Sequence, residues 1–248
     1  MLSAIGRPLL GFLDYLGELA GLAGQIFESL FRGKKRWRLL VHQMVEIGFS
    51  SQPVVIITGA FVGAVLAAQG LFQLSGLKME SMGGALVSVG MLRELGPTLT
   101  GIMLAGRVGA SMSAEIATMK VTEQIDALRS MSVHPIDYLV TPRLIAMIIS
   151  VPLLITEAAA FGIAASWVVG TKTFGVSEAW WTLHTQEHTT LADIYIALIK
   201  GTVFGVLIVL ISCHQGLKAS HGAVGVGKGT TQAMVFSSLA ILIFNFFL

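Results

Sequence analysis

This sequence is short of cysteine and of charge, and each shortage excludes a class of protein. Only one of the 248 residues is cysteine, Cys213, so no disulfide can form within the chain. Charged residues make up 12% of the sequence, against about 25% in a typical soluble domain. Hydrophobic residues make up 54%, and the mean hydropathy is +0.78. The composition therefore excludes an ordinary soluble domain and predicts an all-α integral membrane protein.

Five apolar segments are long enough to cross a bilayer, for which about 20 helical residues are needed. The predicted transmembrane helices are, in order, about 50–77, 83–110, 144–171, 191–213 and 230–248. Small residues along the first span, including Gly59 and Gly63, favour close contact with another helix. Residues 214–228 are rich in glycine, and we expect a cytoplasmic turn there. Residues 39–248 thus form one predicted transmembrane domain.

The first 38 residues differ in character from the rest. Apolar side chains recur at three- and four-residue steps over residues 9–31, which is typical of one face of a helix. Charges lie between them, so we expect a helix lying in the membrane interface; a helix packed on the bundle is the alternative. A basic cluster follows, made of Arg32, Lys34, Lys35, Arg36 and Arg38.

The distribution of basic residues predicts the orientation of the chain. A basic cluster just before the first span favours a cytoplasmic N-terminus. The segment from Lys172 to Asp193 has no basic residue besides Lys172, and it carries Trp180 and Trp181. That composition fits the outer face, with the two tryptophans in an interfacial belt. With five spans, the C-terminus lies outside.

The most informative charged residues inside the predicted spans are Arg93, Glu94, Glu157 and Lys200. Such residues are costly in a bilayer and usually mark a functional pathway, although they can also pair and hold a bundle together. Pro97 cannot donate a hydrogen bond to the carbonyl of Arg93, so a kink is expected there. With Leu95 and Leu99 beside it, the Arg93–Glu94 pair supplies a polar centre within apolar walls. We expect Glu94 to be the partner of Arg93.

Charged residues are again frequent between the second and third predicted spans, over residues 111–138. Apolar residues recur there with helical spacing, which predicts one amphipathic helix from Glu115 to Met131. A helix held between two spans is well placed to meet a soluble partner. Its charged residues are Glu115, Lys120, Glu123, Asp126 and Arg129.

Two short motifs resemble known sites without their context. Residues 222–229, GAVGVGKG, nearly match a phosphate-binding loop, but Gly229 replaces the hydroxyl residue and no predicted strand precedes it. We therefore expect ATP and Mg²⁺ to be bound by a partner and not by this chain. His184, Glu187 and His188 follow the H-x-x-E-H order of some zinc peptidases. A third ligand from a neighbouring helix is not evident, so the sequence alone does not predict a metal site.

Several segments resemble the MlaE/YrbE family of ABC-transporter permeases. The resemblance begins at RELGP (93–97) and continues through AGRVGASMSAEIATMKVTEQIDALRSM (105–131). It extends through HPIDYLVTPRLIAMIISVPLL (134–154), LIKGTVFG (198–205) and GVGKGTTQAMV (225–235), and covers about residues 40–248.

This resemblance implies a non-catalytic permease of the bacterial inner membrane that moves phospholipids or related lipids. Such a permease pairs with a second copy of itself, with cytoplasmic ATPase subunits and with an MCE-domain protein on the outer face; nucleic acid is not a partner. The segment Glu115–Met131 corresponds to the family's coupling helix, and Arg93 and Glu94 correspond to charged residues near its lipid cavity. No role carries over for Glu157.

Two other functions stay open from the sequence. A proton-coupled secondary transporter would use Glu94, Glu157 and Lys200, but it would need inverted repeats, which the sequence does not show. The third possibility is a structural membrane scaffold.

Overall fold

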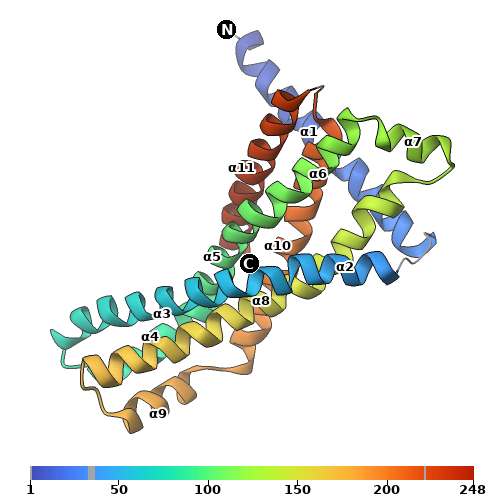
Figure 1. Ribbon diagram of the computed structural model, residues 1–248. Coiled ribbons are helices and arrows are strands. Elements are labelled where there is room, and N and C mark those ends of the chain that lie inside the picture. The colour runs from blue at the N-terminus through green and yellow to red at the C-terminus, as the bar shows by residue number, and fades with distance from the viewer. Residues whose placement is uncertain (1, 33–36, 221) are drawn as a thin grey trace.

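The computed structural model describes residues 2–32, 37–220 and 222–248, and these residues form helices joined by short turns, with no strand among them (Figure 1). The predicted all-α class is therefore confirmed. Of the basic cluster, Lys34, Lys35 and Arg36 lie outside the described residues.

The α-helices are α1 (Leu2–Arg32), α2 (Trp37–Ile47), α3 (Gln52–Ser75), α4 (Gly83–Gly90), α5 (Gly96–Leu104), α6 (Ala110–Val121), α7 (Gln124–Ser130), α8 (Thr141–Val168), α9 (Glu178–His188), α10 (Leu191–Lys218) and α11 (Ala223–Phe247). Short 3₁₀ turns are η1 (Phe49–Ser51) and η2 (Glu80–Met82), and π-helical turns are η3 (Met91–Leu95), η4 (Ala105–Gly109), η5 (Ile136–Val140) and η6 (Val169–Thr173).

Four helical segments are long and apolar enough to cross a membrane: Trp37–Ser75, Ile136–Thr173, Leu191–Lys218 and Ala223–Phe247. They cover four of the five predicted spans. The remaining predicted span, 83–110, is built from α4, η3, α5 and η4, and it differs from a uniform apolar helix because charged residues and two π-helical turns interrupt it. The membrane protein is thus multi-pass, and the count of five stays a prediction.

Helices α3 and α8 pack along each other through small residues. A Cβ atom added at Gly63 would lie 2.1 Å from the carbonyl oxygen of Gly162, and one at Gly59 would lie 2.4 Å from that of Ala158. Only glycine allows the two backbones to approach so closely. The predicted small-residue contact face of the first span is therefore confirmed.

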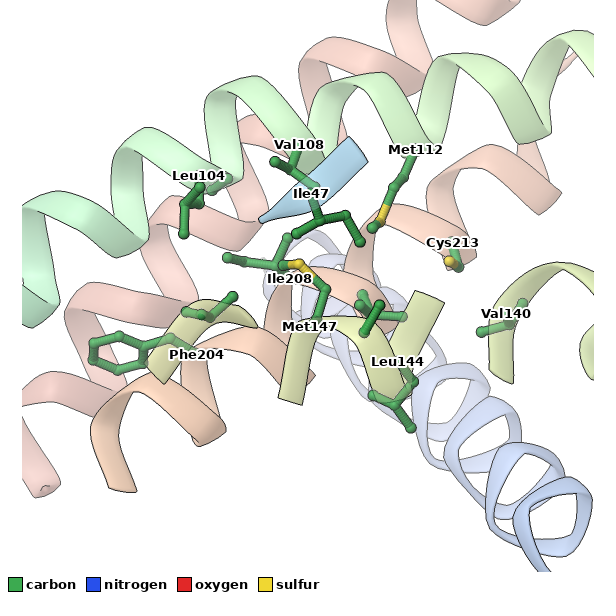
Figure 2. Close-up of a cluster of buried hydrophobic side chains, with 14 of the residues drawn as sticks. Ile47, Leu104, Val108, Met112, Val140, Leu144, Met147, Phe204, Ile208 and Cys213 are labelled. Atoms are coloured by element: carbon green, nitrogen blue, oxygen red, sulfur yellow. The ribbon is translucent and has the colours of Figure 1, made fainter. Parts of the chain in front are cut away.

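A hydrophobic core lies where α2, α6, α8 and α10 meet (Figure 2). Ile47, Val108, Met147 and Ile208 converge there from four different segments of the chain, and Phe204 extends the cluster along α10. This packing joins the predicted spans into one bundle.

The two ends of the bundle carry different loops. At one end α9 packs against α4 and η2, and α7 lies at the opposite end (Figure 1). The turn between α3 and α4 and the loop before α10, both predicted outside, are thus at the same end. The arrangement agrees with the predicted alternation of spans, while the direction of insertion stays a prediction.

The structure corrects two of the predicted loops. The helix expected from Glu115 to Met131 is two helices, α6 and α7, because the backbone turns at Thr122 and Glu123; Glu123 has a left-handed φ of 59°. The turn expected over 214–228 is present but much shorter than predicted. Helix α10 continues to Lys218 and α11 begins at Ala223, so the connection is confined to the few residues between them. Gly222 lies there with a left-handed φ of 87°, whereas Gly216 lies within α10 and packs closely against α6.

Two further predictions need refinement. Trp181 does not lie in an interfacial belt, since it is buried against Gly83, Gly84 and Gly170; its neighbour Trp180 is exposed. Helix α1 exists as predicted, but its two halves differ. Leu22 and Ile26 pack on the bundle, which is the alternative left open above, whereas Leu10, Leu13 and Leu16 are exposed.

Candidate functional site

A polar cluster forms where the π-helical turn η3 meets α10 and α11. Pro97 has no N–H to donate, and Gly96 donates back to Met91 instead. The carbonyl of Arg93 therefore lacks the N–H that would donate to it from position 97 in an α-helix. Lys200 Nζ donates to this carbonyl oxygen over 2.9 Å, while the expected kink stays a prediction.

Lys200 is the centre of the cluster. Its side chain is 3% exposed, and Nζ also donates to Glu94 Oε1 at 3.1 Å and to Asn245 Oδ1 at 3.0 Å. Asn245 Nδ2 in turn donates to Glu94 Oε2 over 2.8 Å. Three acceptors thus satisfy the three donors of the ammonium group. Lys200 thus joins Arg93 and Glu94 in one cluster, and the partner of Glu94 is Lys200 and not Arg93.

Arg93 pairs with a residue that the sequence reasoning placed in a loop. Arg93 Nε donates to Asp193 Oδ1 over 2.5 Å, and the Asp193 side chain is fully buried. Asp193 Oδ2 also accepts from the backbone N–H of Thr190 over 2.8 Å and forms a capping box that begins α10. The Thr190-x-x-Asp193 spacing before an apolar run was the signal that could have revealed it. Asn245, a lone amide among aromatic residues, was missed as well.

The charged groups of the cluster differ sharply in exposure. Asp193 and Lys200 are enclosed, whereas the side chains of Arg93 and Glu94 are 49% and 58% exposed. Large apolar side chains on the same helices are also exposed, among them Leu99, Ile199, Leu242 and Phe246. The cluster therefore presents one cationic and one anionic group on an otherwise apolar surface.

Not every predicted cavity residue joins the cluster. Leu95 packs on a hydrophobic core and Leu99 is partly exposed. Glu157 is half-buried on the side of α8 that exposes Leu153 and Phe161, and among the described residues no hydrogen bond or ion pair joins it to the cluster. The structure thus brings Arg93, Glu94 and Lys200 together and leaves Glu157 separate.

The predicted coupling residues fall into two groups. Glu115 Oε2 accepts from the buried Arg143 Nη2 over 2.6 Å, which joins α6 to α8. Lys120 Nζ donates to the carbonyl of Leu217 over 2.5 Å. Asp126 and Arg129 form an exposed pair at 3.1 Å on α7. Glu115 and Lys120 therefore hold the structure together, while Asp126 and Arg129 face outward.

A pocket of about 630 Å³ opens beside α7, at the end of the molecule opposite α9. Lys120, Asp126 and Arg129 line it, together with Leu22 and Gln25 of α1. Most of the apolar face of α6 and α7 is already used: Ile116 and Ile125 are buried within this chain, and Met131 is exposed.

Helix α1 is tied to the same end of the bundle by Glu18. Its carboxylate accepts from Lys218 Nζ at 2.6 Å and lies 2.9 Å from His214 Nε2. The hydrogen bond from Lys218, followed by that from His214, holds the pKa of Glu18 below its ordinary value.

Several apolar helices with an ion-paired polar cluster among them define a multi-pass α-helical membrane protein. The chain belongs to the MlaE permease family, since the sequence model described as Permease MlaE matches residues 40–248.

Three relatives illustrate the family. A probable ABC transporter permease protein of Rickettsia typhi is 41% identical over 242 residues, which cover 98% of this chain and 93% of the relative. The intermembrane phospholipid transport system permease protein MlaE of Haemophilus influenzae is 34% identical over 252 residues, covering 100% and 95%. The chloroplastic protein TRIGALACTOSYLDIACYLGLYCEROL 1 of Arabidopsis thaliana is 37% identical over 229 residues, covering 92% and 65%.

Proposed function

We propose that this chain is the membrane-spanning permease of an ABC transporter that moves phospholipids between membranes. Family membership supports the proposal, as does the name of the Haemophilus influenzae relative. The observation that carries it is that the charged side chains of Arg93 and Glu94 are each about half exposed on an apolar surface. A phospholipid has the same combination of a charged headgroup and apolar tails.

Arg93 is the residue that would hold the headgroup. Its contact with Asp193 is made through Nε, and half of the side chain is exposed. The planar guanidinium can therefore present its outer nitrogens to a phosphate in a fork. The buried Asp193 keeps the charge of Arg93 paired when no lipid is present, which avoids the cost of an isolated ion in the bilayer.

Glu94 would tune release of the lipid. It lies beside Arg93, and Lys200 and Asn245 fix it in place. A fixed negative charge next to the phosphate disfavours very tight binding, so the lipid can leave again. The cavity would be closed by a second copy of this chain, whose exposed apolar side chains would meet those of α11.

Energy would come from a separate cytoplasmic ATPase. The exposed pair Asp126–Arg129 on α7, with Glu123 at the preceding turn, forms the proposed docking surface. Lys120 and Glu115 connect this surface to α10 and α8. A movement of α7 would therefore be passed to two spans through the contacts of the neighbouring helix α6. ATP and Mg²⁺ would be bound by that partner.

An MCE-domain protein would meet the outer face, and the inner membrane of a bacterium is the proposed location, with the N-terminus inside. A proton-coupled transporter is not favoured, because the relatives are named as ABC transporter permeases and no described hydrogen bond or ion pair joins Glu157 to Glu94 or Lys200.

Purification of the native complex through a tag on this chain tests the proposal. We expect an ATPase subunit, an MCE-domain protein and bound phospholipid in the preparation. Glu123→Lys is expected to weaken ATPase binding or uncouple hydrolysis from transport, while Glu178→Lys on α9 serves as a charge-matched control that changes neither. Absence of any ATPase from the parental complex would contradict the proposal.

A further inference from the structure

Helix α9 carries a cluster of ligand-type side chains that the transport function does not use. His184, Glu187 and His188 each offer one ligand atom, and these atoms all lie within 4.8 Å of one another. The residues are at positions i, i+3 and i+4 of one helix, so they share a face. His184 Nδ1 and Glu187 Oε2 are 3.5 Å apart, close to the roughly 3.3 Å that a tetrahedral zinc with bonds of about 2.0–2.1 Å requires.

The two histidines are arranged in a way that suits a metal. His188 Nδ1 lies 3.0 Å from the carbonyl of His184. Donation to that carbonyl fixes the tautomer and leaves the Nε2 lone pair of His188 for a ligand, as is usual for metal-binding histidines. His184 Nδ1 is shielded from solvent and has no hydrogen-bond partner among the described residues. A bound cation would satisfy this nitrogen.

The surroundings hold the three side chains in position. The ring of Trp180 stacks on that of His184 with centroids 5.8 Å apart. One residue further along, Trp181 is buried against the glycines at the start of α4 and anchors the whole helix. Lys172 is paired with Glu178 at the other end of α9, so this ammonium group does not compete for Glu187. A rigid helix lowers the cost of ordering the ligands when a metal binds.

We propose that His184, Glu187 and His188 form a surface site for a divalent transition-metal ion, with zinc as the best fit. Imidazole and carboxylate ligands suit zinc. Three protein ligands leave a fourth position open, which water or a side chain of another protein can fill. The site lies at the end of the bundle that holds the turn between α3 and α4 (Figure 1).

Zinc titration of the purified full chain, carrying a tag without histidine, tests the proposal. We expect saturable binding of one zinc ion per chain and a rise in the melting temperature on adding zinc chloride. His188→Ala is expected to weaken binding at least tenfold and to remove the melting shift. His134→Ala, an exposed histidine on a different loop, is the matched control and should bind zinc like the parent.

Two results would overturn the site: no saturable zinc binding by the parent, or equal binding by the parent and His188→Ala. If His188→Ala loses helical content by circular dichroism, Glu187→Gln replaces it. Glu187 is exposed, and its substitution removes a charged ligand at constant size. Parental zinc affinity in a folded Glu187→Gln variant would also count against the site as described. Zinc binding and the melting temperature are measured without any transport assay, so a negative result would not contradict the proposed transport function.

Discussion

Replacement of Lys200 by methionine is expected to destabilise the bundle by about 3 kcal/mol. The ammonium group donates to the carbonyl of Arg93 and to the side chains of Glu94 and Asn245, and Lys200 is buried. Each net hydrogen bond contributes about 1 kcal/mol, and bonds of charged groups contribute somewhat more. We keep the lower value because Glu94 is more than half exposed and retains its bond from Asn245. Methionine fills a similar volume, so the cavity term is small.

Thermal unfolding in detergent measures this effect. For a chain of this size about 2–4 °C corresponds to 1 kcal/mol, so the expected fall is about 6–12 °C. Lys172→Met is the matched control, because Lys172 pairs with Glu178 at an exposed site, and such surface pairs contribute about 0–1 kcal/mol. Equal melting temperatures for the parent and Lys200→Met, or an equal fall in both variants, would refute the assigned role of Lys200.

Three further predictions address other contacts. Gly63→Ala should destabilise the protein by about 1–3 kcal/mol through overpacking, since its Cβ would lie 2.1 Å from the backbone of α8. Gly227→Ala is the control, because nothing lies within 4 Å of the added Cβ, and similar melting temperatures for the two variants would refute the prediction. Glu115→Ala should cost about 3–5 kcal/mol because it leaves the buried Arg143 unpaired, and Arg143→Met in the same chain should restore most of the loss in the same assay. The lowered pKa of Glu18 means that its contribution to holding α1 is complete above its ordinary pKa of 4.5 and is lost as the pH falls through the lower folded value. Protease cleavage within α1 should therefore rise only in that acidic range, and a Glu18→Gln variant that keeps the same rise would contradict this.

Most of the secondary structure could be predicted from composition and periodicity. Four predicted spans match apolar helices because a run of about 20 uncharged residues has few other stable conformations in a membrane. Turns were predicted less well. Gly225, for example, favours a loop in the sequence pattern, yet it lies within α11, where the backbone of Ser220 approaches it closely. A glycine in a membrane helix is ambiguous between these two uses, and only the packing partner decides.

The candidate site was predicted by its intramembrane charges, and its pairing was not. Proximity in sequence suggested that Arg93 pairs with Glu94, but adjacent residues on a helix point in different directions. Their partners come from the start of α10 and the end of α11, about a hundred or more residues away. Such contacts depend on the tertiary arrangement of the spans, for which the sequence pattern holds no direct signal.

The observed pairing decides which variant tests the central claim, that the Arg93 cluster binds phospholipid. Removal of both Arg93 and Glu94 would leave Asp193 and Lys200 as buried unpaired ions, and this would destabilise the helical bundle. Arg93→Gln combined with Asp193→Asn neutralises one complete pair, and the side-chain oxygen of asparagine can still accept from the backbone N–H of Thr190.

Mass spectrometry of phospholipid bound to the purified complex is the most direct measurement. We predict that the neutral pair variant assembles with its ATPase but carries no more lipid than an unrelated membrane protein purified in the same way. Parental amounts of bound phospholipid in that variant would contradict the account.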